Sequence, residues 1–171
     1  FIPEAKALKA KCLAALFPSE QPLSLEIGCG IGDFIVQLAL RHPERNFLAT
    51  DIFNQGCLKT GSRVDEAGLS NVRVMRSEAR FLMTHLLGPE SLQAIYINCP
   101  DPWPKKRHRK RRLVNHEFLQ LAFHTLQPDG EFHFSTDFVD YGVSVGEMLE
   151  AEPGFANLQR TPHSHELKDY P

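Results

Sequence analysis

The chain has 171 residues, of which 42% are hydrophobic and 23% are charged, and its formal net charge is −2 at pH 7. This length and composition predict one globular domain over residues 1–171 and exclude a disordered or low-complexity polymer. No apolar run approaches the roughly 20 residues that a membrane-spanning helix needs, and no signal peptide is visible. We therefore expect a cytoplasmic protein with no membrane partner, and the start at Phe1 instead of Met leads us to expect a trimmed chain.

Positive charge is concentrated in one stretch. Residues 105–112, here called the basic segment, begin at Lys105 and end at Arg112, and seven of these eight residues are Lys or Arg. The whole chain has 19 basic and 21 acidic residues, so the remainder is acidic. This distribution predicts a local docking site for a polyanion, with a solvated or disordered basic arm as the alternative. No feature of the sequence indicates whether the protein is a monomer or an oligomer.

The four cysteines, at positions 12, 29, 57 and 99, form no C-x-x-C pair. We therefore expect reduced thiols and no cysteine metal site. His163, His165 and Glu166 lie close together near the C-terminus, but polar residues in such a Pro-containing tail are usually exposed. We predict that the protein binds no metal.

Hydrophobic periodicity predicts alternating helices and strands. In chain order these are a helix over 4–17, a strand over 23–27, a helix closed by Pro43, a strand over 46–50, a helix over 54–67, a strand over 72–75, a helix over 79–87, a strand over 92–98, a helix from about 115, a strand over 132–136 and a helix over 140–150. Asn54 and Asn115 are expected to cap helices, and residues 128–130 to turn into the last strand.

This alternation predicts an α/β fold with a mainly parallel, doubly wound sheet. Ligands of such sheets bind beyond the carboxyl ends of the strands. Polar features fall at all five predicted ends: residues 28–32, Asp51, Glu78, Asp101 and Asp137. Their recurrence predicts a ligand site at this edge of the sheet.

The glycine turn, residues 28–32, has the pattern G-x-G-x-G, and Asp33 stands where a dinucleotide fold would place its third glycine. Glu26 and Asp33 disfavour a pyrophosphate and favour a ligand with a cationic, amino-acid-like end, such as S-adenosylmethionine. Asp51 is placed to accept hydrogen bonds from ribose hydroxyls, and Glu78 to meet the adenine amino edge. The alternative is that the glycines form a tight turn and the acids cap helices.

The aspartate loop, residues 99–104, holds Asp101 between two prolines and beside Trp103, the one tryptophan of the chain. A carboxylate here can accept hydrogen bonds from the N1–H and 2-amino edge of guanine, and can offset the positive charge that develops when N7 is alkylated. Lys105 is the basic residue nearest to this acid. The alternative is a Pro-rich turn in which Trp103 packs on the body.

Residues 100–108, followed by Lys110, Arg111 and Arg112, closely resemble the hallmark loop of the tRNA (guanine-N7-)-methyltransferases. The resemblance covers nearly the whole chain, from residues 25–30 onward. It implies a Rossmann-like class I methyltransferase fold, S-adenosylmethionine as methyl donor, and guanine 46 in the variable loop of tRNA as the target. The residues to which it assigns roles are Asp101 for catalysis, Glu26, Gly28, Asp51, Glu78 and Asp101 for the cofactor, and Lys105 and Asp137 for the substrate.

The chain departs from the family pattern at several positions. Asp51 stands where the family usually has Glu, and Glu78 where it has Asp or Asn. A Thr-x-x-Glu substrate motif near the family's C-terminus is not found, because Thr161 and Glu166 have the wrong spacing, so one or two final strands are expected to be missing. The alternative functions are an exocyclic-amine nucleic-acid methyltransferase and a non-catalytic RNA-binding module on the same fold. A nicotinamide dehydrogenase is disfavoured by the glycine spacing.

Overall fold

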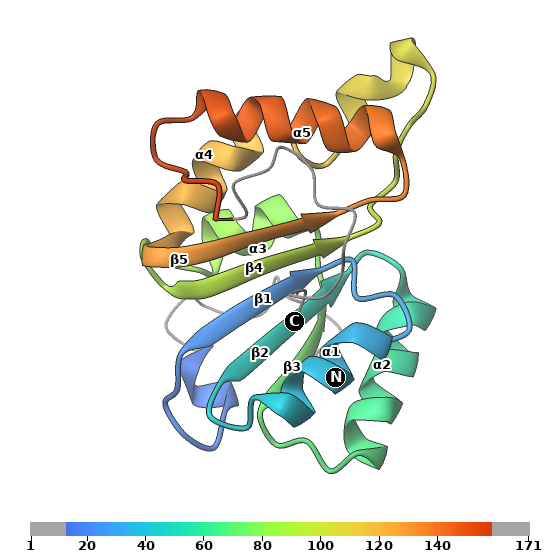
Figure 1. Ribbon diagram of the computed structural model, residues 1–171. Helices are drawn as coiled ribbons and strands as arrows, with labels where there is room; N and C mark the ends of the chain where they lie inside the picture. Colours follow the sequence, from blue (N-terminus) through green and yellow to red (C-terminus); the bar gives the residue numbers. More distant parts are fainter. Residues whose placement is uncertain (1–12, 159–171) are drawn as a thin grey trace.

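The computed structural model describes residues 13–158 and contains one five-stranded sheet (Figure 1). Every strand pair is parallel, and the strand order is β3-β2-β1-β4-β5. The strands are β1 (Leu23–Ile27), β2 (Asn46–Asp51), β3 (Val72–Arg76), β4 (Leu92–Asn98) and β5 (Leu126–Ser135). The helices are η3 (Ala14–Leu16), α1 (Asp33–Arg41), α2 (Asn54–Glu66), α3 (Ala79–His85), η4 (Lys106–Arg111), α4 (His116–Thr125) and α5 (Val139–Ala151), of which η3 and η4 are 3-10 helices.

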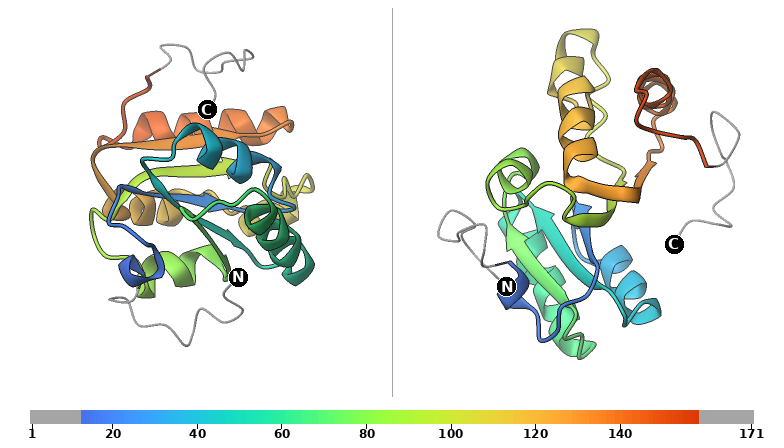
Figure 2. Two further views of the ribbon diagram at one scale, coloured as in Figure 1. Left: turned by 90° about the horizontal axis from the view of Figure 1, so that it is seen from below. Right: turned by 90° about the vertical axis from the view of Figure 1, so that its left-hand side faces the viewer.

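Helices cover both faces of the sheet, as the two turned views show (Figure 2). One apolar cluster joins the sheet to α1 and α2, and the other joins it to α3, α4 and α5. Side chains alternate between these clusters: Ala94 and Tyr96 of β4 face the first, whereas Ile95 and Ile97 face the second. The predicted doubly wound parallel sheet is therefore confirmed. The predicted helix over residues 4–17 lies mostly outside the described residues.

Helix caps agree with the prediction in one case and not in the other. The side chain of Asn115 accepts a hydrogen bond from the backbone N–H of Phe118 and caps α4, as predicted. Asn54 is not a cap, because it is the first residue of α2. Phe53 is the N-cap residue and α2 has no side-chain cap. The backbone N–H of Phe53 donates to the Asp51 carboxylate at 2.9 Å, so the acid at the end of β2 holds the residue that precedes the helix.

The prediction for the start of the last strand was wrong. β5 begins at Leu126 and includes the predicted turn, which forms a bulge between the pairs Leu92–Leu126 and Ala94–Glu131. Pro128 cannot donate to the ladder, and Asp129 has a φ of 62°, so these residues leave the register before the strand resumes. The strand then runs to Ser135 without a further register shift.

Because all five strands are parallel, their carboxyl ends lie at one edge of the sheet. The glycine turn follows β1, and the aspartate loop follows its neighbour β4. This edge therefore brings together the chain segments that carry the predicted site residues. No helix in the described part of the chain is long and apolar enough to cross a membrane.

Candidate functional site

The glycine turn is held by backbone hydrogen bonds to β2. The N–H groups of Gly28 and Cys29 donate to the Thr50 carbonyl at 2.8 and 3.1 Å. Gly28, Gly30 and Gly32 have φ values of 82°, 53° and 86°, a region that favours glycine. A Cβ atom added to Gly28 or Gly30 would meet no atom within 4 Å. These two glycines therefore border open space, and a ligand could approach their backbone closely.

Asp51 ties this turn to the following helix. Its Oδ2 atom accepts a hydrogen bond from Gly30 N–H at 3.0 Å, and its Oδ1 atom accepts the one from Phe53 N–H. The carboxylate is half-buried. A carboxylate has about four acceptor positions, so two remain for ligand hydroxyl groups. The predicted placement of Asp51 beside the glycine turn is thus present in the structure, and its contact with ribose remains a prediction.

Glu26 is a buried acid under the same edge. It lies on β1 between Ala49 and Tyr96, faces α1 and α2, and is 2% exposed. Burial raises its pKa from 4.5 to about 8, while a hydrogen bond with Asn98 lowers it and the charge of Asp51 raises it. Its Oε2 atom has no hydrogen-bond partner in residues 13–158. A cationic ligand group beside it would favour the ionised carboxylate and would satisfy the unpaired acceptor.

These features fit the amino-acid end of S-adenosylmethionine. The uncompensated acid suits its ammonium group, and the open glycine backbone leaves room for its chain. Residues 13–158 contain no group of three or more His, Cys, Asp or Glu side chains able to hold a metal ion. His163, His165 and Glu166 lie outside the described residues.

Glu78 has a structural role that the helix-cap alternative foresaw. It is the N-cap of α3, and its Oε2 atom accepts a hydrogen bond from Phe81 N–H at 2.8 Å. The side chain is exposed, and Ser77 N–H, one residue earlier, donates to the Asp51 carbonyl. This hydrogen bond places the residue before Glu78 next to the end of β2. The contact of Glu78 with adenine remains a prediction.

The aspartate loop leaves β4 with strained backbone. Cys99 and Trp103 have φ values of 45° and 41°, a backbone conformation that residues other than glycine rarely adopt. Cys99 N–H donates to the Ser135 carbonyl at 2.9 Å, and this bond joins the ends of β4 and β5. Asp101 is exposed in the loop, and Asp137 is exposed two residues beyond the end of β5.

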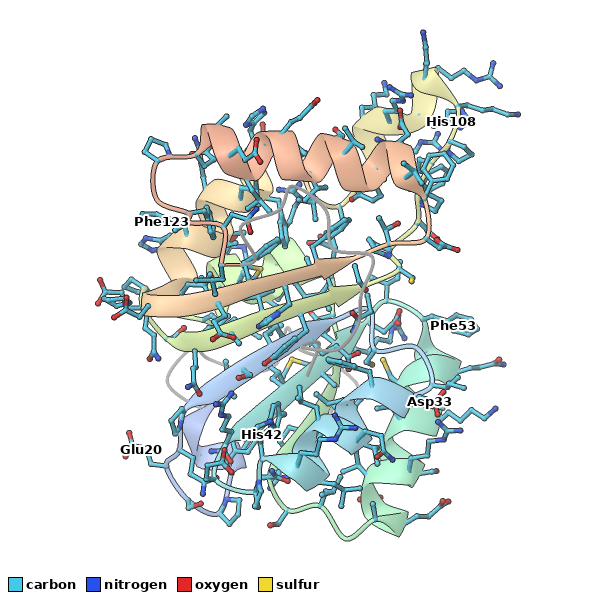
Figure 3. All side chains as sticks on the ribbon, in the orientation of Figure 1. Glu20, Asp33, His42, Phe53, His108 and Phe123 are labelled. Carbon is cyan, nitrogen blue, oxygen red and sulfur yellow. The ribbon has the colours of Figure 1, made fainter. Side chains whose placement is uncertain are left out.

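The basic segment forms the 3-10 helix η4, preceded by Lys105 as its N-cap residue. It projects from the body beside α5, where His108 is labelled in Figure 3. Trp103 packs within this projection, with the Arg111 guanidinium 4.9 Å from the centre of its ring and His108 in edge contact. The packing alternative for Trp103 thus has direct support.

One part of the basic segment differs from the prediction of a continuous docking surface. Arg112 is 6% exposed and forms an ion pair with Asp140 of α5, which also pairs with Arg109. Arg112 is therefore largely withheld from solvent, whereas its neighbours in the basic segment are exposed. The hydrogen bond from Arg112 lowers the pKa of Asp140, so this acid stays ionised.

Asp140 was predicted only as a residue at the start of the last helix. Its contact with Arg112 joins residues 28 positions apart and leaves no local pattern in the chain. The surplus of cations in residues 105–112 was the one available signal, because a buried arginine requires an acidic partner.

A family model described as "Putative methyltransferase" matches residues 20–170. A tRNA (guanine-N(7)-)-methyltransferase from Syntrophotalea carbinolica is 53% identical over 171 residues, which are 100% of this chain and 74% of that protein. One from Geobacter metallireducens is 50% identical over 158 residues, which are 92% of this chain and 75% of that protein.

A solved structure shows the same fold at low sequence identity. A SAM-dependent O-methyltransferase from Thermotoga maritima superimposes with a TM-score of 0.59 at 14% identity and covers 84% of this chain and 49% of that chain. The fold is thus that of the Rossmann-like class I methyltransferases. With the identities and coverage of the curated relatives, this shows that the chain belongs to the tRNA (guanine-N7-)-methyltransferase family.

Proposed function

We propose that this chain transfers the methyl group of S-adenosylmethionine to N7 of a guanine in the variable loop of tRNA, guanine 46 in the family. The observation that carries the proposal is the arrangement on two neighbouring strands. β1 presents a buried acid and an open glycine turn, and β4 presents the aspartate loop followed by the basic segment. This arrangement supports a site for a cationic cofactor next to an exposed acid and a projection that attracts polyanions.

In this proposal four side chains and one backbone segment hold the cofactor. Glu26 meets its ammonium group, the Gly28 backbone borders its amino-acid chain, and Asp51 accepts hydrogen bonds from its ribose hydroxyls. Glu78 meets the adenine amino edge, and Asp101 completes the site on the side of the substrate. S-adenosylmethionine supplies the electrophilic methyl group.

Asp101 is the proposed catalytic residue. Guanine N7 carries no proton, so its methylation needs no strong general base. Asp101 accepts hydrogen bonds from guanine N1–H and the 2-amino group, which aligns N7 and offsets the positive charge that develops on the ring. Its exposure in the loop leaves it accessible to a base in solution.

Lys105 and Asp137 are the proposed contacts to the target nucleotide. Exposed cations of the basic segment, among them Lys106, Arg107 and Lys110, bind the phosphate backbone, a role that their exposure supports. We place the activity in the cytoplasm, in line with free thiols at Cys29, Cys57 and Cys99.

The test is methylation of purified tRNA with labelled S-adenosylmethionine, followed by borohydride-induced strand cleavage to map 7-methylguanine. We expect cleavage at one guanine of the variable loop. Asp101→Asn should lose turnover by at least about 100-fold while tRNA affinity changes little, because alignment and charge stabilisation are lost and docking is not. Asp129→Asn is the matched control. Asp129 is also an exposed aspartate in an irregular stretch of backbone, but it lies near the start of β5, at the opposite edge of the sheet.

Two results would replace this proposal. Label on an exocyclic amine of adenine or cytosine would assign the chain to the amino-methyltransferases. Tight tRNA binding without any S-adenosylmethionine binding in calorimetry would favour the non-catalytic RNA-binding module.

A further inference from the structure

Arg112 is the buried cation of the basic segment. Its side chain is 5% exposed, whereas that of Arg109, which shares its acidic partner, is 43% exposed. The Nη2 atom of Arg112 donates to Oδ2 of Asp140 at 2.7 Å. Its Nε atom donates to the backbone carbonyl of Pro102 at 2.9 Å. One guanidinium group therefore joins the aspartate loop to α5.

The surroundings of Arg112 fix the position of this guanidinium. Its central carbon lies 4.6 Å from the ring centre of Tyr141 and 5.9 Å from that of Phe138. Tyr141 is itself fully buried, and its hydroxyl accepts a hydrogen bond from Val114 N–H at 3.0 Å. The guanidinium thus lies on a platform that α5 holds in place, next to the exit of the basic segment.

The aspartate loop needs such an external donor. Pro100, Pro102 and Pro104 have no backbone N–H, so the loop cannot hold itself by the usual backbone ladder. The Pro102 carbonyl is adjacent to Asp101 in the chain, so fixing this carbonyl restricts where the Asp101 carboxylate can point. A guanidinium donates in two directions from one rigid plane, whereas the three donors of a lysine ammonium rotate freely at the end of a flexible chain.

We propose that Arg112 is a positioning residue for methyl transfer: it holds the Asp101 loop against α5 through Pro102 and Asp140, and it makes no contact with tRNA. This inference rests on the function proposed above. It divides the basic segment into exposed cations that bind tRNA and a buried one that acts on the chemistry through Asp101.

The test compares Arg112→Met, which keeps an unbranched side chain of similar length, with the wild-type chain. We expect kcat to fall by on the order of 100-fold, the loss that a displacement of about 1 Å can cause. The KM for tRNA and the salt dependence of tRNA binding should stay near wild type, because Arg112 binds no phosphate in this proposal. Arg112→Lys should recover part of kcat, since an ammonium can keep one of the two contacts.

Arg80→Met is the matched control. Arg80 also anchors the end of this region, with Nη2 donating to the Leu113 carbonyl and to Oδ1 of Asn115, but it does not bond to the aspartate loop. Loss of Arg80 should lower thermal stability and leave kcat within about threefold of wild type, because Asp101 keeps its alignment. A general effect of losing a structural arginine would instead lower kcat equally in both variants and would overturn the proposal.

A second readout does not depend on catalysis. Trp103 is the chain's one tryptophan and follows Pro102 directly, so its fluorescence reports on the loop. Arg112→Met should increase quenching of Trp103 by acrylamide while the far-ultraviolet circular dichroism is unchanged. If the wild-type chain methylates no tRNA, the proposed function fails, and this quenching still tests whether Arg112 holds the loop.

Three outcomes would overturn the role of Arg112. They are unchanged quenching in a folded Arg112→Met chain, unchanged kcat, and a defect confined to tRNA KM and salt dependence. If Arg112→Met does not fold, Asp140→Asn removes the acidic partner with a smaller change of shape. It should show the same pattern of lowered kcat and increased Trp103 quenching, and wild-type values in that variant would equally refute the inference.

Discussion

Replacing Glu26 by Gln should make the cofactor-free protein more stable. Burial raises the pKa of Glu26 from 4.5 to about 8, so the folded state holds a proton that the unfolded state releases in that pH range. Wild-type stability therefore falls as pH rises from about 4.5 to about 8, because the unfolded chain binds fewer protons than the folded one there. Glutamine keeps the shape and has no proton to lose.

The size of the effect follows from this linkage. One pKa unit corresponds to about 1.4 kcal/mol, so at pH 7 the burial of Glu26 costs roughly 3 kcal/mol relative to a neutral side chain. At pH 5 the same calculation gives less than about 1 kcal/mol, because there the pH is only slightly above the pKa of the unfolded carboxyl. Burial of the glutamine amide offsets part of the gain, so roughly 3 kcal/mol is the upper end at pH 7.

The assay is urea unfolding of wild type and Glu26→Gln at pH 5, 7 and 8.5, with calorimetric titration of S-adenosylmethionine at pH 7. We expect the stability difference to grow with pH, and we expect the variant to bind the cofactor less tightly because it lacks the anion that would meet the ammonium group. Glu20→Gln is the control: Glu20 is exposed and stays hydrated in both states, so its substitution should give no comparable gain.

A stability difference that does not change between pH 5 and 8.5 would refute the reasoning, because it would not come from a proton. A variant that is more stable but binds the cofactor with wild-type affinity would support the buried charge and remove Glu26 from the proposed cofactor site.

Three further predictions concern the surface and the frame of the site. Replacing both Lys106 and Lys110 by Glu should weaken tRNA binding. The slope of log K for tRNA binding against log salt concentration should become less negative, by up to about 1 for each phosphate that the variant no longer neutralises. An unchanged slope would mean that tRNA docks on another surface. Asn71→Asp should lower the free energy of unfolding by about 2–4 kcal/mol in urea titrations. The buried Asn71 amide donates to one backbone carbonyl of α1 and to two of the α1–β2 connection, and a carboxylate would repel all three. Gly32→Ala should cost roughly 2–3 kcal/mol in thermal unfolding, since its φ is 86° and the added Cβ would lie 2.8 Å from Thr60 Cγ2; a wild-type melting temperature would contradict this.

Much of the fold could be predicted because its signals are local. Short apolar runs separated by amphipathic segments predict a parallel sheet, and the structure contains one. Asn115 indicates the start of α4 because it caps the residues that directly follow it. Asn54 misled the prediction because α2 begins one residue earlier than a cap at position 54 would require, and Phe53 is the N-cap residue. The bulge in β5 was mistaken for a turn because Pro128 signals a break in both.

The site divides in the same way. The positions of the strand-end acids follow from the chain order, whereas their hydrogen-bond partners depend on long-range packing. The raised pKa of Glu26 results from its burial between Ala49 and Tyr96, which the alternating pattern of β1 alone does not predict. The burial of Arg112 depends on α5 lying beside the basic segment, so a count of positive charges overestimates the positive charge that this segment exposes to solvent.

The contacts of Arg112 also determine whether residues 100–112, the family's hallmark loop, would keep their conformation in another protein. The segment reads as a continuous motif, but its geometry depends on Asp140 and Tyr141, which come from a helix after the next strand. Grafting residues 100–112 onto another methyltransferase scaffold would therefore transfer the acid and the charges without the support that orients them. A chimera needs the start of α5 as well, so the smallest transplantable unit runs from the end of β4 through the first turn of α5.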